Sequence, residues 1–312
     1  MEKKKLAIVI PAYKIDFFDK VLQSLDKQTN KEFNVYIGID ASKSDFESII
    51  KKYQETIHIT YKRFEENLGG KDLVGQWNRC LSLTQNEEWI WLFSDDDMME
   101  SNCVENFYQQ LKTDDSFDLY HFNVNIINEN DNLIEITPEY PDIIKSITFL
   151  KQKCSAKIDS YVVEYIFRKS TFIKVGGFQK FDLAWGSDIS TWAKIGKEKG
   201  IKTIKGSRVL WRKSSLNITP AKGNEILIRK ISAYIQFFLW CKSYFPEINI
   251  YNIYYYMFRS IFHYAPYLKS QNLDNIISPL YNYNLLGKLI KHAIIIAFPL
   301  LQILHHIIHK YK

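Results

Sequence analysis

Three consecutive carboxylates, Asp95, Asp96 and Asp97, carry the clearest chemistry in the sequence. They follow Ser94 at the end of an apolar run, which predicts a position at the mouth of a β-sheet. Carboxylates this close together repel one another unless a cation lies between them. Mg²⁺ and Mn²⁺ prefer carboxylate oxygens and usually keep coordination sites for phosphate oxygens. The triplet therefore predicts a metal site that holds a diphosphate, or an acidic loop that only caps the helix beginning near Ser101.

Strand-like and helix-like segments alternate through the first hundred residues, and this order predicts βαβ units in a mostly parallel sheet. Ligands of such sheets bind where the strands end. The strand ends predict that four loops meet at one edge: 11–13, 40–44, 67–71 and 94–97. The periodicity predicts strands at 6–10, 33–40, 57–61, 88–94, 117–124 and 159–167, helices near 17–25, 44–54, 71–85, 102–112 and 187–199, and a hairpin around 129–132.

The motifs at these loops resemble the family 2 glycosyltransferases, enzymes of the GT-A fold that move a sugar from a nucleotide diphosphate to an acceptor. The resemblance covers about residues 6–215. It implies an α/β fold with a mixed, mostly parallel nucleotide-binding sheet flanked by helices. The resemblance also implies that Asp40 contacts the base and that Asp95 faces the ribose. The implied nucleotide-sugar contacts are Pro11, Ala12, Tyr13, Asp40, Asn67, Gly69, Asn78, Asp95 and Arg212.

The resemblance also assigns the metal and the phosphate contacts. Asp96 would hold Mg²⁺ or Mn²⁺, with Asp97 as a second ligand, although many members carry Asp where this chain has Ser94. Arg212 is expected to neutralise the departing diphosphate, because a guanidinium binds phosphate oxygens at two points. A solvated basic turn is the alternative for Arg212. For Asp40 and the Asn67–Gly70 segment, the alternative is an ordinary turn.

An inverting transfer needs a base that takes the proton of the acceptor hydroxyl as that hydroxyl attacks the anomeric carbon. The segment around Asp188 resembles the family's acceptor side, in which an Asp at a helix start is this base. Without the resemblance, Asp188 would be an acidic residue stabilised by the helix dipole. Trp185, Gly186 and Ser187, just before it, are the predicted acceptor contacts.

Charge separates the chain into two parts. Residues 221–312 hold ten Lys and Arg against three acidic residues, a net charge of +7, while the first 220 residues are close to balance. The predicted domains are therefore 1–220, with a nucleotide-binding half 1–100 and an acceptor half 101–220, and a helical, basic and aromatic extension, 221–312. An apolar helical pattern over 285–312 predicts a helix that lies on a membrane surface, packs within the protein or a dimer, or spans the membrane.

These features predict a metal-dependent inverting glycosyltransferase of bacterial surface polysaccharide assembly, acting on a nucleotide sugar and a glycan or lipid-linked acceptor. A nucleotidyltransferase is the first alternative, but it usually carries a Gly- and Arg-rich loop where this chain has 11–14. A non-catalytic carbohydrate- or membrane-binding protein is the second. No nucleic-acid motif is recognisable. The short apolar run before Pro11 and the scattered cysteines predict a cytoplasmic protein with reduced thiols, peripheral on the inner face of the cell membrane.

Overall fold

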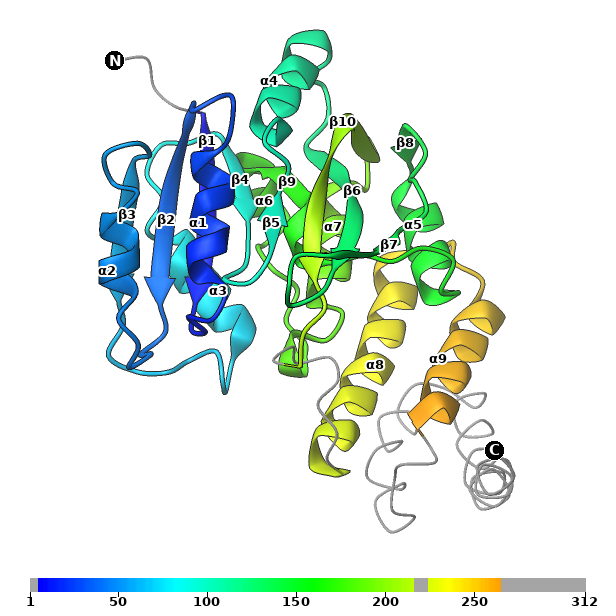
Figure 1. Cartoon of the computed structure of the whole chain (residues 1–312). Coiled ribbons are helices and arrows are strands. Elements are labelled where there is room, and N and C mark those ends of the chain that lie inside the picture. Colours follow the sequence, from blue (N-terminus) through cyan, green and yellow to red (C-terminus); the bar gives the residue numbers. More distant parts are fainter. Residues whose placement is uncertain (1–4, 216–223, 265–312) are drawn as a thin grey trace. The chain divides into compact units, whose positions relative to one another are not determined.

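The computed structural model describes residues 5–215 and 224–264 (Figure 1). Contacts along the chain divide it into two units. The first unit comprises Met1–Gln179 and Thr191–Leu216, and the second comprises Lys180–Ser190 and Asn217–Lys312. The short segment 180–190 thus groups with the C-terminal helices. The boundary expected after residue 220 stays a prediction.

A single sheet forms the framework of the first unit, in the order β3-β2-β1-β4-β9-β6-β10-β5, with β7 beside β6 and β8 beside β10. Its longest pairings, β1 with β2, β2 with β3 and β6 with β10, are parallel. The strands are β1 Leu6–Ala12, β2 Phe33–Ile39, β3 Ile59–Arg63, β4 Trp89–Leu92, β5 Met98–Met99, β6 Leu119–Ile127, β7 Leu133–Ile136, β8 Ile143–Ile144, β9 Tyr165–Arg168 and β10 Ile201–Arg212. The predicted α/β fold with a mostly parallel sheet is confirmed.

Helices cover both faces of this sheet. Apolar side chains of α1, α2 and α4 pack on one face. On the other face, Phe172 of α6 and Trp192 of α7 pack against Phe167 of β9. The helices are α1 Phe18–Asp26, α2 Phe46–Lys51, α3 Leu73–Leu81, α4 Cys103–Thr113, α5 Ser146–Cys154, α6 Lys169–Lys174 and α7 Ser187–Ile195, with 3₁₀ turns at Val162–Glu164 and Asp182–Ala184.

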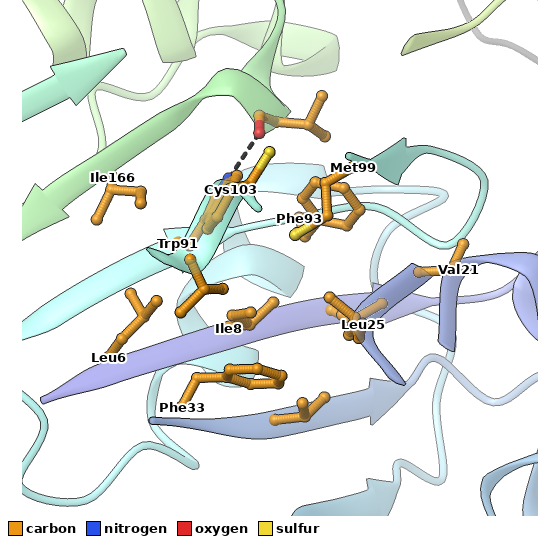
Figure 2. Close-up of a cluster of buried hydrophobic side chains, with 14 of the residues drawn as sticks. Leu6, Ile8, Val21, Leu25, Phe33, Trp91, Phe93, Met99, Cys103 and Ile166 are labelled. Atoms are coloured by element: carbon orange, nitrogen blue, oxygen red, sulfur yellow. Dashed lines mark hydrogen bonds between the residues drawn. The ribbon is translucent and has the colours of Figure 1, made fainter. Parts of the chain in front are cut away.

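The core explains why the opening strand is apolar at every position. Leu6 and Ile8 of β1 belong to the same buried cluster as Val21 and Leu25 of α1, and Figure 2 draws all four, while Ala7 and Val9 are buried on the opposite face. A strand covered on both sides has no solvent-facing row and reads as a continuous apolar run. Burial on both faces holds β1 and its neighbour β4 in place. These strands therefore position the loops that follow them.

One buried polar contact ties the core to the middle of the chain. The indole Nε1 of Trp91 in β4 donates a hydrogen bond of 2.7 Å to the carbonyl of Val163, the dashed line in Figure 2. Most buried indole N–H groups in proteins have such a partner. The contact joins β4 to the 3₁₀ turn before β9.

The described part of the second unit contains the 3₁₀ turn at 182–184, the start of α7, and two helices, α8 Asn224–Tyr244 and α9 Ile250–Tyr264. No helix within residues 5–215 and 224–264 is long and apolar enough to cross a membrane. The helix expected over 285–312 lies outside the described residues. All four cysteines are free thiols; Cys80, Cys103 and Cys241 are buried, and Cys154 is half-buried.

Candidate functional site

The acidic loop follows β4 and is closed by its own side chains. The hydroxyl of Ser94 donates to Oδ2 of Asp97 at 2.6 Å and accepts the backbone N–H of Asp97 at 3.1 Å. Oδ1 of Asp97 accepts the backbone N–H of Arg212 at 2.6 Å. Both carboxylate oxygens of Asp97 are therefore used to shape the loop and to attach it to the end of β10.

Asp95 joins the loop to the end of the neighbouring strand β1. Its Oδ2 accepts the backbone N–H groups of Tyr13 and Lys14, each at 2.7 Å. β1 and β4 are parallel neighbours, so their carboxyl ends lie at the same edge of the sheet. The structure thus brings together two of the loops that the sequence predicted to meet, with Tyr13 itself half exposed at this edge.

Asp96 and Asp97 are buried, with the half-buried Asp95 beside them in the chain, and this placement sets their electrostatics. Burial, followed by repulsion from Asp96, raises the pKa of Asp95 to about 6 and raises the pKa of Asp97 well above its usual range. Burial also raises the pKa of Asp96, while the charges of Lys14 and Arg212 lower it. Each raised pKa means that ionising these carboxyl groups costs free energy in the folded protein. A bound cation would reduce that cost.

The donor set fits a metal ion held by few protein ligands. Asp95 and Asp97 are engaged in hydrogen bonds that build the loop, which makes Asp96 the carboxylate best placed to hold an ion. Mg²⁺ commonly binds through one or two carboxylates and completes its shell with substrate phosphates and water. Among the described residues, no group of three or more His, Cys, Asp or Glu side chains is arranged to enclose a metal. The metal roles of Asp96 and Asp97 stay predictions.

Arg212 lies at this site with its side chain fully buried. Its Nε donates to the backbone carbonyl of Asp96 at 2.8 Å, and its Nη1 donates to the carbonyl of Asn128 at 2.8 Å. The guanidinium also stacks over the ring of Phe17 at 4.4 Å. These contacts give Arg212 a structural task beside the phosphate contact that the sequence predicts for it.

Asp131 and Lys20 are site residues that the sequence did not single out. Asp131 sits in the hairpin turn after β6 and pairs with Nη1 of Arg212 and Nζ of Lys20, both at 2.6 Å. Asp131 has a left-handed backbone, with φ of 65°, as Asp tolerates in turns. The predicted hairpin carried the signal, but nothing in the sequence linked its turn to Arg212.

The predicted base-reading residue, Asp40, holds the loop 67–70. Its Oδ1 and Oδ2 accept the backbone N–H groups of Leu68 and Gly69, each at 2.8 Å. Arg79 of α3 also binds Oδ1 of Asp40 and stacks over Phe64 at 3.9 Å. The carboxylate, 3% exposed, thus brings together two predicted segments and a guanidinium that the sequence reasoning missed.

The remaining nucleotide positions divide between this loop and the end of β1. The backbone N–H of Asp40 donates to the carbonyl of Ala12 at 2.8 Å, next to the half-buried Pro11. Asn67 donates from Nδ2 to the Asp40 carbonyl at 3.3 Å. Asn78 is exposed on α3, one residue before Arg79. Their contacts with a nucleotide stay predictions.

The predicted base and acceptor contacts belong to the second unit. Asp188 is in the first turn of α7 and is half-buried. Ser187 is buried, and its Oγ accepts the backbone N–H of Phe181 at 3.0 Å. Gly186 has a left-handed backbone with φ of 86°, and Trp185 contacts Lys230 of α8. Their roles in catalysis and acceptor binding stay predictions.

Comparison with known families matches residues 7–171, more than half of the chain, to Glycosyl transferase family 2. The chain belongs to this family. No curated protein matches the chain in sequence. The family assignment agrees with the edge described above, where the loops after β1, β2 and β4 carry the motifs that resembled it.

Solved structures similar to this chain include TarS from S. aureus. The TarS 1–349 complex with UDP-GlcNAc has a TM-score of 0.61 and 13% identity, over 97% of this chain and 91% of that one. The TarS 1–349 complex with UDP has a TM-score of 0.57 over the same shares, also at 13% identity. A longer TarS structure has a TM-score of 0.59 and 12% identity, over 90% of this chain and 46% of that one. These similarities show that the fold is of the GT-A type.

Proposed function

We propose that this glycosyltransferase uses a nucleotide-diphosphate sugar, with UDP-sugars the first candidates, and inverts the anomeric centre. The observation that carries the proposal is the acidic loop 94–97, held by Asp95 to the backbone at the end of β1. A buried anionic loop at the carboxyl edge of a parallel sheet suits a cation and a diphosphate. TarS, which shares the fold, has been solved with UDP-GlcNAc and with UDP.

In this proposal the chain's own groups divide the work. Asp96 would hold Mg²⁺ or Mn²⁺, and such an ion would offset the charge that develops on the leaving diphosphate. Asp95, Asp97 and Arg212 keep the loop in shape. Asp188 would accept the proton of the acceptor hydroxyl as the hydroxyl oxygen bonds to the anomeric carbon and the bond from that carbon to the phosphate oxygen breaks.

The acceptor in this proposal is a hydroxyl of a glycan or lipid-linked saccharide in bacterial surface polysaccharide synthesis. A protein with that task would work in the cytoplasm at the inner face of the cell membrane. The net charge of +7 in residues 221–312 supports attraction to an anionic surface. Flotation with anionic vesicles, with and without residues 285–312, measures this association.

The test of the base is Asp188→Asn. We expect sugar transfer to fall by at least a hundredfold, in line with a general-base contribution of about 10²–10⁴, with UDP binding unchanged. Full activity in this variant would remove Asp188 from the mechanism. A wild-type protein that binds UDP-sugars without releasing UDP would instead favour the non-catalytic alternative.

A further inference from the structure

The turn that leads into α7 has a strained backbone. Leu183 and Ala184 are both left-handed, each with φ of 55°, and Gly186 follows with φ of 86°. A residue with a side chain costs about 1–2 kcal/mol in this region. Two in succession persist only where the surroundings hold them. The turn ends at Gly186, whose carbonyl accepts the N–H of Ser190 at 3.0 Å and so begins the helix that carries Asp188.

Arg229 of α8 binds Asp182, the first residue of this turn, with two hydrogen bonds. Its Nε donates to Oδ2 of Asp182 at 2.8 Å, and its Nη2 donates to Oδ1 at 2.7 Å. Oδ1 of Asp182 also accepts the backbone N–H of Leu183 at 2.9 Å. This bidentate geometry fixes direction as well as distance. The hydrogen bonds from Arg229 lower the pKa of Asp182, so the pair stays charged at neutral pH.

The next residues of α8 contact the rest of the turn. Lys230, which is 1% exposed, lies over the Trp185 ring at 4.9 Å. Tyr234 meets the same ring edge-on, with the ring centroids 5.7 Å apart. Phe237 lies 3.1 Å from where a Cβ on Gly186 would be. Positions 230, 234 and 237 share one face of a helix, so this face of α8 contacts the turn along its length.

From these contacts we infer that Arg229 is a positioning residue for acceptor activation, acting through Asp182 on the helix start that carries Asp188. This inference rests on the proposed function. Arg229 and Asp182 are 37% and 40% exposed, so their ion pair contributes little to stability. Its effect is on geometry, where a displacement of about 1 Å can cost about a hundredfold in rate. Helix α8 is thereby part of the catalytic apparatus.

The test measures UDP release with Mn²⁺ from the sugar that the wild type hydrolyses fastest among UDP-glucose, UDP-galactose, UDP-N-acetylglucosamine and UDP-glucuronate. Arg229→Met and Asp182→Asn are each expected to lower kcat about tenfold, with the Kd for UDP within twofold of wild type. The double variant should lose no more than either single variant, because the two residues act as one unit. Arg259→Met, an exposed arginine of α9, is the matched control.

Arg229→Lys keeps the charge without the planar fork and should have an intermediate kcat. It carries the same test if Arg229→Met does not fold. Unchanged kcat in folded variants, additive losses, or an equal loss in UDP affinity would overturn the positioning role alone. A wild type that releases UDP from none of the four sugars would overturn the proposed function and this role with it.

Discussion

Replacing Asp96 with Asn should make the protein more stable and less active. Asp96 is buried between two carboxyl groups, and its charge helps to raise the pKa values of both Asp95 and Asp97. Asn has nearly the same shape but no charge. The variant therefore removes the repulsion within the loop, together with the group best placed to hold a metal ion.

The size of the expected gain in stability follows from the pKa shift of Asp95. Raising its pKa from 3.8 to about 6 corresponds to about 3 kcal/mol at 1.36 kcal/mol per pKa unit. Burial is the larger cause and Asp96 the second, so we assign about 1 kcal/mol to Asp96. A similar contribution at Asp97 brings the expected stabilisation to about 1–2 kcal/mol, or a rise in Tm of about 2–4 °C.

The assay is thermal unfolding at pH 8 without metal or nucleotide, paired with titration of the preferred UDP-sugar with and without Mn²⁺. The matched control is Asp97→Ala, which leaves the Ser94 hydroxyl and the Arg212 N–H without their acceptor. Its expected cost is about 1–3 kcal/mol for each buried group. Asp96→Asn should lose the Mn²⁺-dependent part of donor binding. A less stable Asp96→Asn, or donor binding that still depends on Mn²⁺, would refute this account of the loop.

Single contacts elsewhere in the first unit set three more expected outcomes. Gly69→Ala would place a methyl carbon 2.7 Å from Oδ2 of Asp40. We expect this variant to bind UDP more weakly by calorimetry. An unchanged affinity for UDP would contradict the close approach of Gly69 to Asp40. Arg212→Lys should destabilise the protein by about 2–4 kcal/mol in urea unfolding, because a buried fork loses its partners; wild-type stability would argue against this. Burial raises the pKa of Glu164 well above its usual range and lowers the pKa of its 3.4 Å neighbour His121 to about 3, so both are neutral when folded. The folded state therefore keeps a proton on Glu164 over a pH range in which the unfolded state has lost it, so Glu164 makes stability fall as the pH rises through that range. Glu164→Gln should remove this contribution. Parallel pH–stability curves of the variant and the wild type would contradict it.

Much of the fold could be predicted because its strands are buried on both faces. The runs at 6–10 and 88–94 contain apolar residues and end in polar loops, and they correspond to β1 and β4. The short strands β5 and β8, of two residues each, could not be predicted, because their pairing with β10 depends on tertiary contacts. Helices α5 and α6 were also missed: α5 buries only Ser146, Phe149 and Leu150, and α6 only Phe172, so neither shows a long apolar face in the sequence.

The sequence predicted which residues belong to the site better than it predicted the contacts between them. The sequence placed Asp95 and the end of β1 at one edge, and the structure joins them directly. The sequence did not show that Arg79 binds the carboxylate of Asp40, or that Arg212 forms an ion pair with Asp131 in the hairpin turn. Long side chains choose partners by three-dimensional proximity, and a single sequence holds no record of those distances.

The central claim, that this family 2 glycosyltransferase cleaves a nucleotide-sugar donor, is tested most directly by UDP release from the UDP-sugar panel with Mn²⁺ and no added acceptor. We expect wild-type protein to release UDP from at least one donor, and we expect EDTA and Asp96→Asn each to suppress that release. A folded wild-type protein that releases UDP from no member of the panel would contradict the claim.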